Sequence, residues 1–177
     1  MDRAKELFYE YHGSRFYMDH DGACREYDSY HVSKETEEMW AEEYVSGFLS
    51  SRLYGKEAHR GYSAAADLIK CCGCGEDWNA CLYYPLRAGH LDDVTVLYML
   101  SDSFRMAEKA VKKHCFSKEE ADAYLEELDG FARQVLARAK NGTMMRAEDY
   151  VLQEFSDPAV VSEHLGCIRK KWEGLFR

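Results

Sequence analysis

The stretch that decides the fold covers residues 91–115 and reads LDDVTVLYMLSDSFRMAEKAVKKHC. Apolar residues recur in it at alternating intervals of three and four, which places them on one face of an α-helix: Leu97, Leu100, Phe104, Ala107 and Val111. The first half of the stretch is apolar on its other sides too, whereas the second half is polar and basic opposite this face. Such a helix is typical of a central element with neighbours packed around it.

The composition favours one helical domain built around this element. The chain has 177 residues, of which 46% are hydrophobic, and it contains two prolines, so long helices can form around one core. We expect a single all-α domain over residues 1–177, an array or bundle of about seven to eight mostly antiparallel helices around the helix at 91–115. Residues 33–175 form its helical core, and residues 1–31 form a less regular, aromatic-rich segment.

Capping residues and apolar stripes predict where the other helices begin and end. Ser33 starts a helix that Gly55 ends, and the next helix runs from about residue 56 to a stop at Gly73. Pro85 is expected to kink or break a short helix that starts after Asp77, because proline removes a backbone donor. Three further helix starts are expected at Ser117, Thr143 and Asp157. Residues 3–31 are expected to be a short helix that ends at Gly13, followed by a turn and extended cover.

Charge and hydropathy limit the classes of partner. Acidic residues outnumber basic ones by 32 to 23, a formal net charge of −9, which argues against a nucleic-acid partner. No apolar run approaches the roughly 20 residues that span a bilayer, and the first residues carry charge where a signal peptide needs an apolar core. Seven cysteines without a secretory signal indicate reduced thiols. We therefore expect a cytoplasmic protein without a membrane partner.

The sharpest local motif is Cys-Cys-Gly-Cys-Gly at residues 71–75. Cys71 and Cys74 have the spacing of a zinc knuckle or a redox dithiol, because a turn between them can bring both sulfurs to one ion. A second matched pair is missing, so we expect no cofactor and keep zinc as an alternative. The competing interpretation is that Cys72 continues the apolar stripe of its helix and Gly73 ends that helix.

A second candidate site lies in the aromatic-rich segment. His12, Asp19 and His20 carry donor atoms that bind transition metals, although their spacing does not place two of them on one helical face. The same segment offers Arg15, Tyr17, Asp19 and His20 as a surface that contacts a ligand or partner, since binding sites are common on irregular segments held by a rigid scaffold. The competing interpretation is a structural cover over the helices.

A third group precedes the central helix. Arg87, His90, Asp92 and Asp93 combine a guanidinium, an imidazole and two carboxylates near one turn, which suits binding of an anion and movement of a proton. The alternative is that the two acids cap the helix and that Arg87 pairs with one of them. Arg87 and His90 are retained as candidate ligand-binding residues.

No nucleophile elbow, P-loop or dinucleotide-binding turn is present in the sequence, which favours a protein that is not an enzyme. The preferred hypothesis is an acidic helical binding or adaptor module that acts through a protein partner, with residues 35–43 and 119–129 as acidic faces for a basic partner. One alternative is a small metal-dependent enzyme or metal-binding protein that uses His12, Asp19 and His20 or Cys71 and Cys74. Another is a homo-oligomeric structural protein.

Overall fold

The computed structural model describes residues 2–73, 75–146, 155 and 157–176. The described residues form helices joined by turns and contain no strand, which confirms the predicted all-α class. The described helices are α1 (Asp2–Glu10), α2 (Arg15–His20), α3 (Cys24–Ser29), α4 (Lys34–Ser50), α5 (Gly55–Cys72), α6 (Trp78–Arg87), α7 (Asp93–Lys112), α8 (Lys118–Lys140) and α9 (Pro158–Glu173). The helix expected after Thr143 falls mostly outside the described residues.

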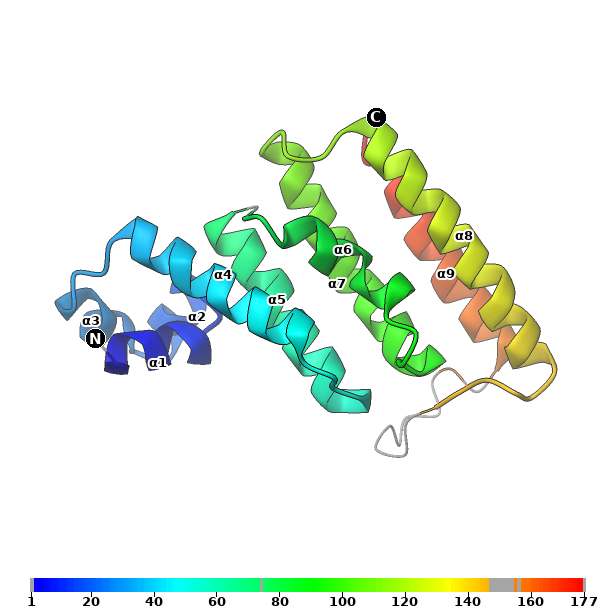
Figure 1. Ribbon diagram of the computed structural model, residues 1–177, viewed down its shortest axis with the longest axis horizontal. Coiled ribbons are helices and arrows are strands. Elements are labelled where there is room, and N and C mark those ends of the chain that lie inside the picture. Colours follow the sequence, from blue (N-terminus) through cyan, green and yellow to red (C-terminus); the bar gives the residue numbers. More distant parts are fainter. Residues whose placement is uncertain (1, 74, 147–154, 156, 177) are drawn as a thin grey trace.

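The helices form an elongated array with α5 and α7 at its centre. In Figure 1, α4 and α6 lie in front of α5 and α7, and the α8–α9 hairpin stands at one end. The short helices α1, α2 and α3 occupy the other end, together with the N-terminus. Helix α7 packs against α5, α6 and α9, so the stretch at 91–115 is the central element that its apolar pattern predicts.

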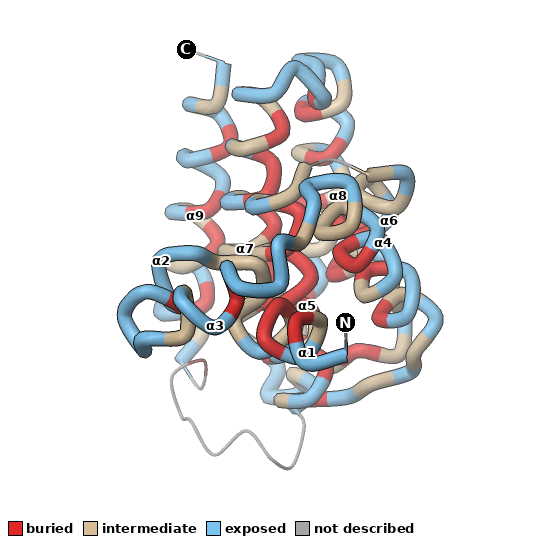
Figure 2. Tube along the Cα trace, turned by 90° about the vertical axis from the view of Figure 1, so that its left-hand side faces the viewer, coloured by how far each residue is buried: buried red, intermediate tan, exposed pale blue. Residues whose placement is uncertain are grey.

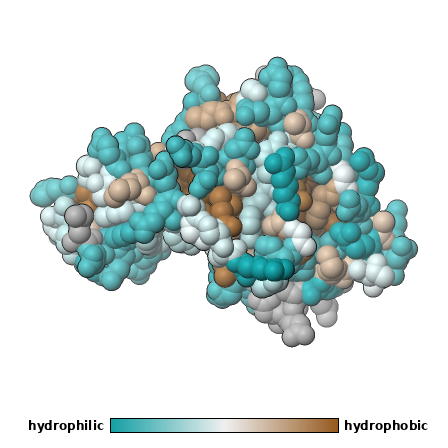
Figure 3. Space-filling model, viewed as in Figure 1, coloured by the Kyte–Doolittle hydropathy of each residue, from teal (hydrophilic) through white to brown (hydrophobic). Residues whose placement is uncertain are grey.

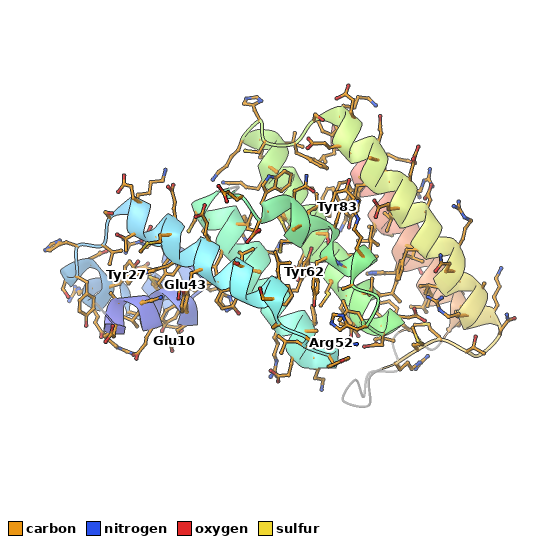
Figure 4. All side chains as sticks on the ribbon, in the orientation of Figure 1. Glu10, Tyr27, Glu43, Arg52, Tyr62 and Tyr83 are labelled. Carbon is orange, nitrogen blue, oxygen red and sulfur yellow. The ribbon has the colours of Figure 1, made fainter. Side chains whose placement is uncertain are left out.

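Two hydrophobic clusters lie along this array. The larger one joins α4 to α9 and includes Tyr62, which lies at the centre of the molecule in Figure 4. The smaller one lies under α1–α3 and includes Trp40 from α4 and Leu68 from α5. Figure 2 shows the buried residues concentrated on the inner sides of the long helices, whereas α2 and α3 are largely exposed. Helices α4 and α5 therefore serve both clusters.

Most of the predicted caps are present. The Ser33 hydroxyl accepts from the backbone N–H of Thr36 at 3.2 Å and begins α4. Ser117 and Glu120 form the predicted capping box of α8, with N···O distances of 3.2 and 2.7 Å. Each of these side chains satisfies a backbone group that the first helical turn leaves unpaired.

Three local predictions are wrong. Helix α4 ends at Ser50, and Gly55, with a φ of 51°, begins α5, because glycine adopts this backbone without a Cβ clash. Pro85 does not break its helix, since α6 continues beyond it to Arg87. The segment after Gly13 is not extended cover but contains two helices, and Ser14 caps the first of them.

No helix among the described residues is long and apolar enough to cross a membrane. The seams between helices on one face are nevertheless apolar. Figure 3 shows hydrophobic side chains gathered on both sides of α6, toward α4 and toward α8. The partly buried residues Leu49, Leu86 and Leu125 belong to the cluster beneath these seams.

Candidate functional site

A cavity of about 310 Å³ lies where α4, the end of α5, the start of α6 and the end of α7 meet. Its floor is apolar and consists of Ala41, Val45, Ile69 and Trp78. The first three of these side chains are at most 5% exposed, so the floor is part of the protein interior. The cavity is thus a place where the core is open to a ligand.

Two glycines in the turn between α5 and α6 give this cavity its shape. Gly73 has a φ of 127°, and a Cβ atom added there would lie 3.1 Å from Nζ of Lys113. A Cβ atom added at Gly75 would lie 2.6 Å from Oε1 of Glu42. Any larger residue at position 75 would therefore displace the Glu42 carboxylate. The glycines let two charged side chains from other helices reach the turn.

The rim of the cavity carries charges of both signs. Carboxylates come from Glu38, Glu42 and Asp77, and ammonium groups come from Lys34 and Lys113. Lys34 and Glu38 form an ion pair at 3.4 Å on the first turns of α4. The other three groups make no hydrogen bond or ion pair with a described residue. Two carboxylates and one ammonium group of the rim therefore have no partner in the described part of the chain.

The Cys72 thiol forms part of the wall. Burial is the main cause that raises its pKa to about 12, and the neighbouring Cys71 thiol and the Glu37 and Glu38 carboxylates add to the effect. The Lys113 ammonium acts in the opposite direction without reversing it. At neutral pH the thiol is therefore protonated, a weak nucleophile and a nearly apolar wall for the cavity.

The predicted N-terminal surface is exposed, and its charged groups have local partners. Arg15 forms an ion pair with Asp28 at 2.5 Å, and its guanidinium carbon lies 4.6 Å from the centre of the Tyr27 ring. His20 lies 2.8 Å from the adjacent Asp21 carboxylate. Such local pairing is what the competing interpretation, a structural cover over the helices, predicts.

One aromatic feature of this surface stays open to solvent. Tyr17 is 54% exposed and packs edge-on against Phe16, which is 73% exposed. Both lie on α2 and are exposed, whereas Met18 of the same helix is buried in the smaller cluster. A partner-binding role for Tyr17 and Asp19 stays a prediction.

The described residues contain no group of three or more His, Cys, Asp or Glu side chains arranged to hold one metal ion. His12, which was grouped with Asp19 and His20, lies instead beside a hollow formed with α4 and α5. Cys71 is exposed at the end of α5, whereas Cys74 lies outside the described residues, so their pairing stays a prediction.

Arg87 and His90 do not form one site with the acids of the central helix. Arg87 donates to both carboxylate oxygens of Glu127 on α8, and its guanidinium lies 3.9 Å from the centre of the Tyr83 ring. Figure 4 shows Tyr83 on the side of α6 that faces α8. His90 Nε2 lies 3.2 Å from the carbonyl oxygen of Leu53. The Arg87 contacts join α6 to α8. The His90 contact joins the turn before α7 to the turn between α4 and α5.

A polar network between α5 and α7 was missed by sequence reasoning. The Asp102 carboxylate accepts from Ser63 at 2.5 Å and from Arg105 at 3.1 Å. Nε2 of His59 lies 3.8 Å from the same carboxylate. Ser63 and His59, both on α5, thus approach the same Asp102 carboxylate of α7. The network ties the two central helices together.

The cavity was also missed, although the motif at residues 71–75 marks its edge. Its residues are spread over positions 34–113 and carry no common spacing, so no local pattern could reveal them. We compared the chain with protein-family models, curated proteins and solved structures, and none of them matches it.

Proposed function

We propose that this chain is a protein-binding module whose cavity at the α4–α5–α6 junction receives an apolar side chain from a basic segment of a partner protein. The observation that carries the proposal is the opening of the core at this cavity, with an apolar floor and a charged rim on which Glu42, Asp77 and Lys113 have no partner among the described residues. Ligand pockets commonly enclose about 300–1,000 Å³, and energetically dominant interface residues fill such pockets. A volume of about 310 Å³ suits a single anchoring residue better than a large cofactor.

The charge around the cavity supports a basic partner. The cavity opens on α4, whose sequence KETEEMWAEEYVSGFLS places five glutamates in its first ten residues. Glu35, Glu42 and Glu43 of this helix are exposed, and the whole chain has a formal net charge of −9. An acidic surface attracts a basic segment and accelerates the encounter, while the buried apolar contact slows dissociation.

The thiols support a reducing compartment for this interaction. All cysteines among the described residues are free, and three of them, Cys71, Cys115 and Cys167, are exposed. Exposed free thiols persist in the cytoplasm, where disulfides are rare. We therefore propose a cytoplasmic location.

The proposal is tested by selecting peptides from a displayed random library on the full chain and measuring their affinity for cavity variants. Ala41→Leu places three more carbon atoms on the cavity floor and should weaken the selected peptides about tenfold or more, since their anchor loses its site. Cys72→Phe fills the cavity from another wall and provides a second test. The matched control is Ala159→Leu, at an exposed position on α9, which should leave the affinity unchanged.

Thermal unfolding of each variant shows whether the fold is intact before binding is measured. The selected peptides should share an apolar residue next to basic residues. Peptides that bind Ala41→Leu and Cys72→Phe as tightly as the wild type would contradict the proposal, as would a selection that yields acidic peptides.

A further inference from the structure

We infer that the anchor in this cavity is the C-terminal residue of the partner, with its side chain on the apolar floor and its α-carboxylate beside Lys113. The inference rests on the proposed function and specifies its ligand. It follows from the position of Lys113, from the separation of the charges on the rim and from the size of the cavity.

Lys113 is the cation of the rim for which the described part of the chain supplies no acceptor. It caps the C-terminal end of α7, and its Nζ atom approaches Gly73 so closely that a Cβ atom there would lie 3.1 Å away. Lys34, the other ammonium group of the rim, is already paired with Glu38 at 3.4 Å. A ligand carboxylate at Lys113 would therefore form an ion pair without breaking one that the protein already makes.

Glu42 and Asp77 are the acids of the rim that have no ion-pair partner among the described residues. Glu42 approaches the other glycine of the turn, Gly75, and Asp77 follows at the start of α6. Neither carboxylate lies within ion-pair distance of Lys113 among the described contacts. The rim thus offers one position for a negative group and separate positions for positive groups. A peptide end with a carboxylate and basic residues before it matches both.

The size of the cavity favours a chain terminus over an internal acidic residue. A C-terminal residue carries its apolar side chain and its carboxylate on the same Cα atom, so both fit within a compact site. An internal aspartate or glutamate would need a second residue to supply the apolar group. About 310 Å³ is close to the lower limit for ligand pockets, which favours the compact arrangement. Capture of a terminal carboxylate is also a recurrent mode of peptide recognition.

The test compares peptides that differ only in their last functional group. The probes are acetyl-Lys-Arg-Lys-X tetrapeptides with X as Leu, Ile, Phe or Met, each prepared as the free acid and as the C-terminal amide, and titrated calorimetrically into the full chain. At least one acid should bind about tenfold or more tightly than its amide, since a hydrogen-bonded ion pair is lost in the amide. Lys113→Met should lower the affinity for the acid to that for the amide and leave the amide unchanged.

The matched control is Lys109→Met, one helical turn earlier on α7 and outside the cavity lining, which should preserve the preference for the acid. Equal binding of acid and amide, with both lost in Ala41→Leu, would overturn this inference and leave the proposed function intact. Absence of binding by all four acids would also overturn it. Free leucine that binds as tightly as the tetrapeptide would indicate an amino-acid site and would contradict both proposals.

Discussion

Asp93 is the one charged side chain that is buried among the described residues, at 2% exposure. Its carboxylate accepts from Nε and Nη2 of Arg138 at 2.9 and 2.5 Å and from the backbone N–H of Met145 at 2.9 Å. This cluster joins the start of α7 to the end of α8. A buried carboxylate is tolerated only when such donors replace the water it has lost.

We expect Arg138→Ala to lower the free energy of unfolding by about 3–5 kcal/mol, because it leaves the Asp93 charge buried without its main partner. Urea denaturation of the purified variant measures this change. The control is Arg169→Ala, which removes ion pairs with Asp129 and Glu173 from a half-exposed side chain. It should cost at most about 1 kcal/mol. Equal losses in the two variants would show that Asp93 does not depend on Arg138.

At the scale of elements, α7 holds the array together, and its stripe is unevenly buried. Leu97, Leu100 and Ala107 are 0% exposed, as predicted. Phe104 and Val111 lie on the same face and are only partly buried, although both pack against the larger cluster. The Phe104 ring lies edge-on to Trp172 of α9 at 5.8 Å between ring centres. The helix therefore contributes most of its packing energy through its first half.

We expect Leu100→Ala to lower the free energy of unfolding by about 3–5 kcal/mol, since it creates a cavity in a fully buried part of α7. Phe104→Ala should lower the free energy of unfolding by less than the volume of the lost ring implies, because this ring is already partly exposed. The measurement is again urea denaturation, with Val160→Ala at a 37% exposed position on α9 as control. A larger loss for Phe104→Ala than for Leu100→Ala would contradict this view of the helix.

At the scale of the whole molecule, two half-buried histidines should make stability depend on pH. Burial is the main cause that lowers the pKa of His12 and of His59 from the ordinary value of 6.5. The carboxylates of Asp67 and Asp102, respectively, oppose this shift but do not cancel it. Below the ordinary pKa, the unfolded chain binds protons at both imidazoles before the folded chain does.

The stabilising contribution of these histidines is therefore complete above about pH 6.5 and is lost as the pH falls through the lowered pKa values of the folded state. We expect the free energy of unfolding to fall between pH 7 and pH 5. The double variant His12→Asn with His59→Gln should lose less over this range. Asparagine is chosen because His12 has a φ of 49°, which asparagine tolerates. Parallel pH profiles for the two proteins would contradict the prediction.

The sequence by itself determined the helical class, the central role of residues 91–115 and the principal caps. These features depend on neighbours three or four residues apart, so the chain displays them locally. Ser33, Ser117 and Asp157 begin helices where their side chains predict them, because a cap needs only the backbone of the following turn. Residues 14–29 were assigned wrongly because two six-residue helices are too short to show a periodic pattern.

Only the tertiary structure decided which side chains share a site. The motif at residues 71–75 lies at the turn that borders the cavity, but the sequence related Cys71 to Cys74, whereas in the fold Cys72 lines the cavity together with Glu38 and Lys113. Likewise, Arg87 lies near Asp92 and Asp93 in the chain, yet it pairs with Glu127, 40 residues away. Packing of α4, α5, α6 and α7 against one another creates the cavity and its opposed charges. Such contacts depend on how helices cross, and no spacing along the chain encodes them.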